Sequence, residues 1–127
     1  MAGEVTVARN NGTQVCERCS LADSAPTRLK GLLGRDRLEH GEGMLLRPAP
    51  AIHTCFMRFP IDAVFLDREL QVIGVTPRLR PWRWARQAGA RAVLELGAGE
   101  ADRLGVRPGE RLRVSPVSAN DGAEARG

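Results

Sequence analysis

Apolar and polar residues alternate in several short runs along the chain, and glycine and proline residues separate these runs. Alternation with a period of two is typical of β-strands that bury one face. Asn10-Asn11-Gly12, between the first two runs, is a strong signal for a β-hairpin turn. The runs predict strands at 4–8, 14–19, 44–46, 52–57, 61–66, 70–75, 92–96 and 110–114.

Two segments carry residues that favour short helices. In the segment 22–34, Pro26 suits the first helical turn and Gly34 suits a left-handed stop. Residues 100–104 precede Gly105 and predict a second helix of one or two turns. With the strands, these helices predict an α+β domain of about six to eight short strands in a mostly antiparallel sheet.

The chain has 127 residues, the length of one typical domain, and it contains no internal repeat. We expect residues 1–117 to form a single α+β domain. Residues 118–127 carry no large apolar side chain, so we expect a disordered C-terminal tail. No apolar run approaches the ~20 residues of a membrane helix, and no signal peptide is evident. These features predict a soluble, cytoplasmic protein with no membrane partner.

Cys16 and Cys19 form a lone C-x-x-C pair among three cysteines. Residues three apart on an extended strand point to opposite faces, so we expect the two thiols to diverge. A zinc site would need a second ligand pair, which the sequence lacks. We therefore expect neither a metal site nor another cofactor.

The segment around His53 gathers reactive side chains. If residues 52–58 are extended, His53 shares one face with a cysteine and a methionine. Pro60 should bend the chain and bring Asp62 near His53 or Arg58. His53 and Asp62 are the catalytic candidates, and the predicted ligand-binding residues are His53, Thr54, Met57, Arg58, Asp62 and Glu95. The alternative interpretation is an ordinary polar residue at a strand end and an acid in a turn.

Residues 78–91 are rich in arginine, contain two tryptophans and lack acidic residues. Guanidinium and indole groups together suit the recognition of phosphates, carboxylates or stacked bases. The alternative is a solvated, irregular loop whose tryptophans pack down on the sheet. The residues predicted to contact an anion are Arg78, Arg80, Trp82 and Arg83.

Three functions fit these residues. The first is a binding or accessory protein whose polar cleft, around His53, Arg58 and Asp62, takes a small anionic ligand or a peptide. The second is a hydrolase-like enzyme in which His53 and Asp62 activate water. The third is a nucleic-acid-binding module that uses the loop 78–91. We rank it last because such modules normally carry more excess charge than the +4 of this chain.

Several blocks of residues follow one another in a specific order: Gly31-Leu32-Leu33-Gly34-Arg35, Gly43-Met44-Leu45-Leu46, residues 53–67, 72–77 and 92–96, and Pro108-Gly109-Glu110. This ordered succession resembles the uncharacterised family called domain of unknown function 192. The resemblance covers about residues 26–114. It implies a compact, mostly β, barrel-like domain, but no established reaction. The family's Trp-Met-Lys-Asn-type segment corresponds here to residues 56–59, where Phe59 replaces the amide.

Overall fold

The computed structural model of the protein describes residues 3–23 and 35–117. Most of the helix predicted over 22–34, and the predicted tail over 118–127, lie outside the described residues. Within these described ranges, no helix approaches the ~20 apolar residues that a bilayer span requires.

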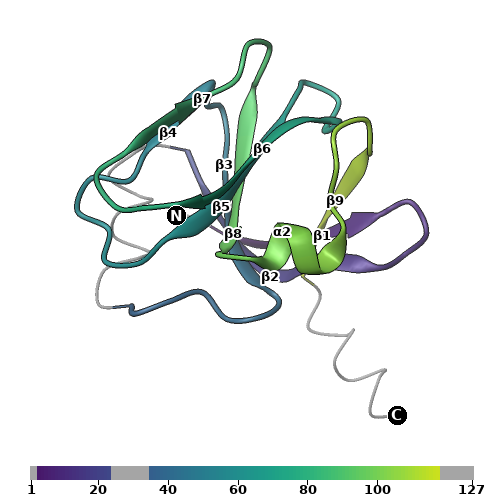
Figure 1. The fold of residues 1–127 in the computed structure, drawn as a ribbon. Helices are drawn as coiled ribbons and strands as arrows, with labels where there is room; N and C mark the ends of the chain where they lie inside the picture. Colours follow the sequence, from purple (N-terminus) through teal and green to yellow (C-terminus); the bar gives the residue numbers. More distant parts are fainter. Residues whose placement is uncertain (1–2, 24–34, 118–127) are drawn as a thin grey trace.

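Seven strands form a curved, mixed and mostly antiparallel sheet in the order β6-β5-β8-β3-β2-β1-β9 (Figure 1). Among the described strands, only β2 and β3 pair in parallel, and they are joined through residues 23–41. Two further strands, β4 and β7, pair as a separate small sheet. The strands of the large sheet are β1 (Glu4–Arg9), β2 (Gln14–Ala22), β3 (Glu42–Leu46), β5 (Ile61–Leu66), β6 (Val72–Leu79), β8 (Ala92–Gly97) and β9 (Leu112–Pro116). The small sheet has β4 (Ala51–His53) and β7 (Trp84–Arg86), and one short helix, α2 (Glu100–Leu104), follows β8.

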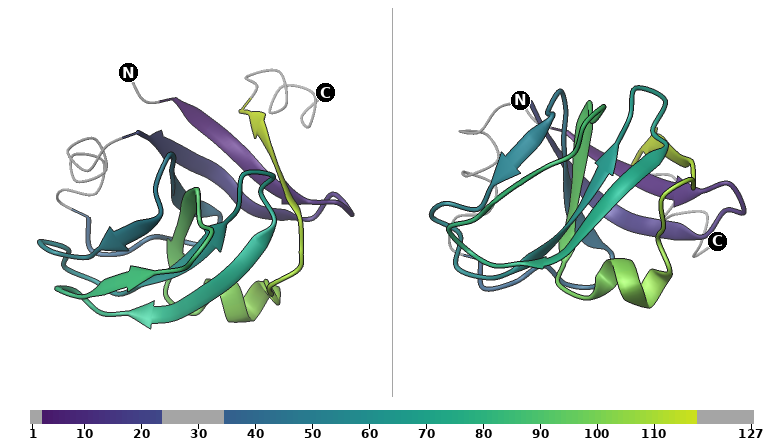
Figure 2. Two further views of the ribbon diagram at one scale, coloured as in Figure 1. Left: turned by 90° about the horizontal axis from the view of Figure 1, so that it is seen from above. Right: turned by 45° about the horizontal axis from the view of Figure 1, so that its top comes forward.

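The two ends of the large sheet approach each other, so the sheet is a half-barrel (Figure 2). The Val72 N–H donates to the Glu110 carbonyl at 2.7 Å, and the Leu112 N–H donates to the Leu70 carbonyl at 2.9 Å. These bonds join the start of β6 to the chain that enters β9. The predicted α+β, mostly antiparallel and barrel-like architecture is confirmed.

Apolar residues fill both faces of the large sheet. On β5, Ile61, Ala63 and Phe65 join the cluster under the small sheet. Val64 and Leu66 join the cluster inside the curve of the half-barrel. Every residue of β5 is buried, which explains its nearly continuous apolar sequence.

The predicted strand over 52–57 is wrong after its second residue, because β4 ends at His53 and the chain then turns. The Met57 N–H donates to the Thr54 carbonyl at 3.1 Å, and Phe56 has a left-handed φ of 70°. His53, Cys55 and Met57 therefore do not share one strand face. The β1–β2 hairpin, β5, β8, and the helix ended by Gly105 are confirmed.

The prediction that Cys16 and Cys19 diverge is also wrong. Val7 pairs with Cys16 and Val5 with Cys19, so two steps on β1 match three steps on β2. The additional residue is a β-bulge, which restores both thiols to one side of the strand. Both cysteines are fully buried in the same cluster. The hydrogen bond between the thiols, reinforced by burial, raises the pKa of Cys19, which favours an unreactive thiol.

Candidate functional site

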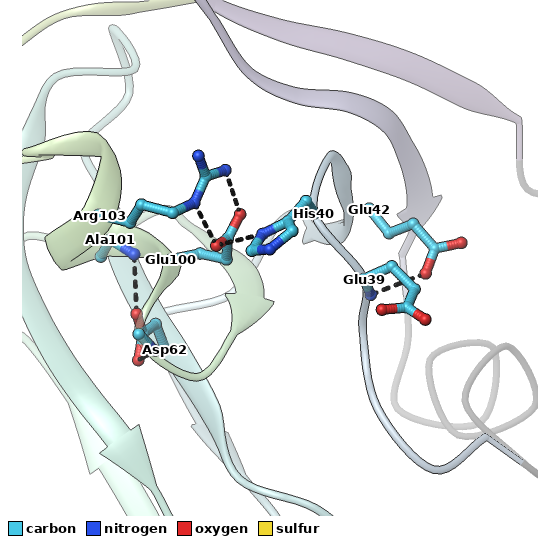
Figure 3. A network of polar contacts seen from close by, with 8 residues as sticks. Glu39, His40, Glu42, Asp62, Glu100, Ala101 and Arg103 are labelled. Carbon is cyan, nitrogen blue, oxygen red and sulfur yellow. Dashed lines mark hydrogen bonds and ion pairs between the residues drawn. The ribbon is translucent and has the colours of Figure 1, made fainter.

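Asp62 is fully buried, and its carboxylate is held by backbone amides. Its Oδ1 accepts the N–H of Arg78 at 2.8 Å and that of Gly99 at 3.1 Å. Its Oδ2 accepts the N–H of Ala101 at 2.8 Å (Figure 3). The N-cap of α2 is Gly99, which has no side-chain acceptor, so Asp62 supplies the acceptor from β5. Asp62 thus ties β6 and α2 to β5.

Glu95 is also fully buried, on β8, but on the other face of the sheet. It pairs across the strands with Met44 and Ala63, which belong to the cluster under the small sheet. Asp62 lies on the same side of β5 as Val64, inside the half-barrel. The two acids predicted to line one cleft are therefore separated by the sheet.

A second polar network lies at the start of α2. The buried Glu100 carboxylate accepts two bonds from the Arg103 guanidinium, at 2.7 and 2.8 Å. It also contacts Nδ1 of the exposed His40 at 2.7 Å (Figure 3). Hydrogen bonds from Arg103, and then from His40, lower the pKa of Glu100 against the opposing effect of burial. The contacts join the loop before β3 to α2, and neither Glu100 nor His40 was predicted as a site residue.

His53 ends β4 and is half-buried. Its Nδ1 accepts the N–H of Cys55 at 3.3 Å, so the neutral ring carries its proton on Nε2. Its ring faces that of Trp84, the opposite residue on β7, with centroids 5.7 Å apart. In Figure 1, β4 and β7 lie at upper left, across the molecule from α2. The structure does not bring His53 and Asp62 together.

Thr54 is fully buried and organises the neighbouring loop. Its hydroxyl donates to the Arg80 carbonyl at 2.6 Å and accepts the Arg83 N–H at 2.8 Å. Its own N–H donates to the Arg83 carbonyl at 2.8 Å, and its carbonyl accepts the Trp82 N–H at 2.9 Å. Thr54 therefore fixes the backbone of 80–83 against the turn after β4, rather than facing a ligand.

The segments held together by Thr54 present large aromatic side chains to solvent. Phe56 is 65% exposed, Trp82 57% and Trp84 73%. Phe56 and Trp82 contact each other, with centroids 4.8 Å apart and planes tilted by 58°. Exposed arginines lie on the same two segments. We call this set the aromatic–arginine surface; it consists of His53, Phe56, Arg58, Arg80, Trp82, Arg83, Trp84 and Arg86.

The backbone that presents two of these rings is strained. Phe56 has a φ of 70° and Trp82 a φ of 64°, in the left-handed region. A residue with a Cβ pays roughly 1–2 kcal/mol there, whereas glycine pays little. Such strain concentrates at functional sites, where the surrounding structure enforces it. Here the bonds of Thr54 enforce it, and the result is a pair of exposed rings in contact.

No acidic residue occurs in the segments 51–61 and 77–91. Within the described residues, no carboxylate forms an ion pair with Arg58, Arg80, Arg83 or Arg86. Arg78, which was predicted to join them, lies apart because its guanidinium approaches Gly99 beside α2. The surface therefore has a local excess of positive charge that the net charge of +4 does not convey.

The structure does not place Asp62 on a common surface with His53 and Arg58, because Asp62 has no exposed surface. Met57 is buried, and Arg58 is exposed in the turn after β4. Sequence reasoning missed Phe56, because the turn that exposes it contains no glycine or asparagine.

The fold and this surface define a small, mostly β half-barrel domain with a separate two-stranded sheet that carries exposed rings. The chain belongs to the DUF192 family, described as "Uncharacterized ACR", which matches residues 6–114. The predicted family membership is thereby confirmed.

Two relatives and two solved structures are similar to the chain. A UPF0127 protein of Thermococcus sibiricus is 30% identical over 100 residues, covering 75% of this chain and 64% of the relative. A UPF0127 protein of Pyrococcus furiosus is 35% identical over 63 residues, covering 49% of this chain and 53% of the relative. The chain thus matches less than two thirds of the length of each.

The crystal structure of a Novosphingobium aromaticivorans protein of unknown function has a TM-score of 0.73 at 28% identity. It covers 88% of this chain and 84% of that one. A Sinorhizobium meliloti protein described as a proposed transcription regulator also has a TM-score of 0.73, at 24% identity. The match covers 90% of this chain and 94% of that one. At that identity, the second similarity concerns the fold alone.

Proposed function

We propose that this domain is a binding or accessory protein that holds an anionic partner on the aromatic–arginine surface. One observation carries the proposal: three exposed aromatic side chains lie on the same two segments as four exposed arginines that form no ion pair with a described carboxylate, and these segments contain no acid. Guanidinium groups form bidentate bonds with carboxylates and phosphates, and exposed rings add apolar contact. A small anionic ligand or an acidic peptide has the complementary chemistry.

The backbone geometry supports the same function. Exposed aromatic residues in left-handed conformations cost stability, and they bury little surface in return. Contact with a partner would cover these rings and offset that cost. This makes the surface a better candidate than the predicted cleft, whose acid is already bonded to three amides.

The hydrolase-like alternative has less support. A water-activating pair needs the acid within hydrogen-bond reach of the imidazole or of its water. The Asp62 carboxylate instead accepts N–H groups from β6 and the start of α2, and it is closed to solvent. His53 is bonded to Cys55 and faces Trp84. Binding is the function that these contacts favour.

The proposal can be tested with polyglutamate as an anionic probe. The chain contains two tryptophans and no tyrosine, so its intrinsic emission comes from Trp82 and Trp84 on the surface itself. We expect polyglutamate to change this emission at low salt. Arg80→Gln with Arg83→Gln should weaken the binding about ten-fold or more, by removing two charge-assisted contacts.

The matched control is Arg107→Gln with Arg113→Gln, which removes the same charge from exposed positions outside the surface. It should leave binding within about two-fold of the unaltered chain, because screening limits distant charges. Equal weakening by both double variants would mean that net charge alone drives binding, and the proposal would fail. Absence of any response to polyglutamate and to the other anionic ligands of the next subsection would also overturn it.

A further inference from the structure

We infer that the anionic partner is a single strand of nucleic acid, whose bases stack on the exposed rings while its phosphates meet the arginines. This inference rests on the proposed function and names its partner class. It is carried by the kind of apolar group that the surface exposes and by the arrangement of these groups.

The large apolar groups exposed on the surface are all aromatic. Among the described residues, the large exposed hydrophobic side chains are Phe56, Trp82, Trp84 and Val117, and the valine follows β9. An aliphatic patch would suit the acyl chains of a lipid or the leucine side chains of a helix. Aromatic faces suit planar groups, and a base stacked on such a ring contributes substantially to affinity without depending on sequence.

The rings form two pairs on two adjoining segments. Phe56 contacts Trp82 at 4.8 Å, and His53 faces Trp84 at 5.7 Å. The planes within the pairs are tilted by 58° and 54°, so neither pair forms a parallel slot that would enclose one base. Phe56 and Trp82 in one pair, and Trp84 in the other, each keep more than half of their surface exposed. Two exposed pairs match successive bases of a strand better than the one base of a mononucleotide.

The positive charges of the surface suit the phosphate backbone of a single strand of nucleic acid. Arg58, Arg80, Arg83 and Arg86 have no carboxylate partner among the described residues. Guanidinium planes can both bind phosphate and stack on bases. The bases of a duplex are stacked on one another, so their faces are closed to Trp82 and Trp84, whereas a single strand leaves them accessible.

Two other partners are weaker fits. An acidic peptide satisfies the arginines, but it offers few planar groups to the rings. A bilayer rich in anionic lipid would attract both arginine and tryptophan at its interface. Here Phe56 contacts Trp82 and Trp84 contacts His53, and the large aliphatic side chain that is exposed among the described residues is Val117, after β9. Both partners are distinguished by the experiment below.

The test compares ligands of matched charge by tryptophan emission. The full chain is titrated with a short oligothymidylate, an abasic oligonucleotide of the same length, the corresponding duplex, polyglutamate, and vesicles with anionic lipid. We expect the oligothymidylate to bind about ten-fold or more tightly than the abasic strand, since stacking is lost without bases. Its affinity should fall steeply with salt, as each phosphate contact releases counterions.

Ring substitutions give the second measurement. Phe56→Leu and Trp82→Leu should each weaken oligothymidylate binding about five-fold or more, and leave abasic binding nearly unchanged. Arg107→Gln serves as the control outside the surface, and far-ultraviolet circular dichroism checks that each variant is folded. Trp84 remains as the reporter in the Trp82 variant.

The outcomes separate the two proposals. Equal affinity for the abasic strand and the oligothymidylate would overturn the inference and leave anion binding intact. Preference for the duplex, for polyglutamate or for vesicles would also overturn it. If none of the anionic ligands changes the emission, both the inference and the proposed function fail.

Discussion

Asp62 on β5 accepts the backbone N–H of Ala101 at 2.8 Å, although 39 positions separate the two residues. The same carboxylate accepts the amides of Arg78 and Gly99. Asp62→Asn places an NH₂ group, which cannot accept, against these donors and leaves at least one of them unsatisfied. We expect a loss of about 3 kcal/mol in the free energy of unfolding, measured in urea. Asp102→Asn, at an exposed position of α2, is the control and should change stability by less than about 0.5 kcal/mol.

Thr54 should control the shape of the aromatic–arginine surface. Thr54→Val keeps the side-chain volume but removes the hydroxyl that bonds to the Arg80 carbonyl and the Arg83 N–H. We expect a loss of about 2 kcal/mol and a change in tryptophan emission, because the 80–83 loop loses its anchor. Thr54→Ser retains the hydroxyl and should preserve the emission spectrum. Unchanged emission and stability in the valine variant would contradict the role given to this residue.

The left-handed backbone of Trp82 predicts an unusual order of stabilities. Trp82→Gly relieves a φ of 64°, whereas Trp82→Ala keeps a Cβ in the same strained region. The glycine variant should therefore be more stable than the alanine variant by about 1 kcal/mol. At Trp84, on β7, the order should be reversed, since glycine weakens a strand. Thermal melting of the four variants tests this comparison.

Alanine substitutions at two strand glycines should differ in their cost to stability, because different atoms surround the two positions. A Cβ at Gly97 would lie 2.5 Å from the Leu38 carbonyl oxygen, a backbone atom that cannot move without shifting its loop. A Cβ at Gly74 would meet the end of the Gln87 side chain, which can rotate away. We expect Gly97→Ala to cost about 2 kcal/mol or more, and Gly74→Ala less than about 1 kcal/mol. Similar unfolding midpoints for the two variants would count against the close approach of Leu38 to β8.

Glu100 predicts part of the acid sensitivity of the fold. Its pKa is lowered in the folded state by Arg103 and His40, so its stabilising contribution is complete above the unfolded-state pKa and is lost as pH falls through the folded-state pKa. The loss should therefore begin below about pH 4. Glu100→Gln should lower stability at neutral pH by about 1 kcal/mol and flatten this dependence. Parallel stability curves for the variant and the unaltered chain would refute the assignment.

The strands were predictable where alternation and turn residues agreed. The hairpin at Asn10-Asn11-Gly12 and the strand after Pro60 follow from local rules, because the turn chemistry and the apolar pattern point the same way. The end of α2 at Gly105 was also predictable, because glycine readily adopts the left-handed conformation that ends a helix.

The errors arose where a distant contact outweighed the local pattern. The sequence of residues 54–57 was read as part of a strand. Thr54 instead forms a hydrogen bond to Arg80, 26 positions further along the chain, and residues 54–57 form a turn. The bulge in β2 depends on the register with β1, which periodicity does not encode. Asp62 was correctly seen to lie near a bend, but its partners at 99–101 could not be inferred from spacing. The candidate site shifted accordingly from Asp62 to the exposed rings.

The β4–β7 pair forms its own hydrogen-bonded sheet, apart from the seven strands that carry most of the core. Amino-acid substitutions on the outer face of β4 and β7 therefore do not remove strand-pairing hydrogen bonds of the larger sheet. If the aromatic–arginine surface binds as proposed, its side chains can be exchanged to alter the preferred partner while the larger sheet keeps its pairing.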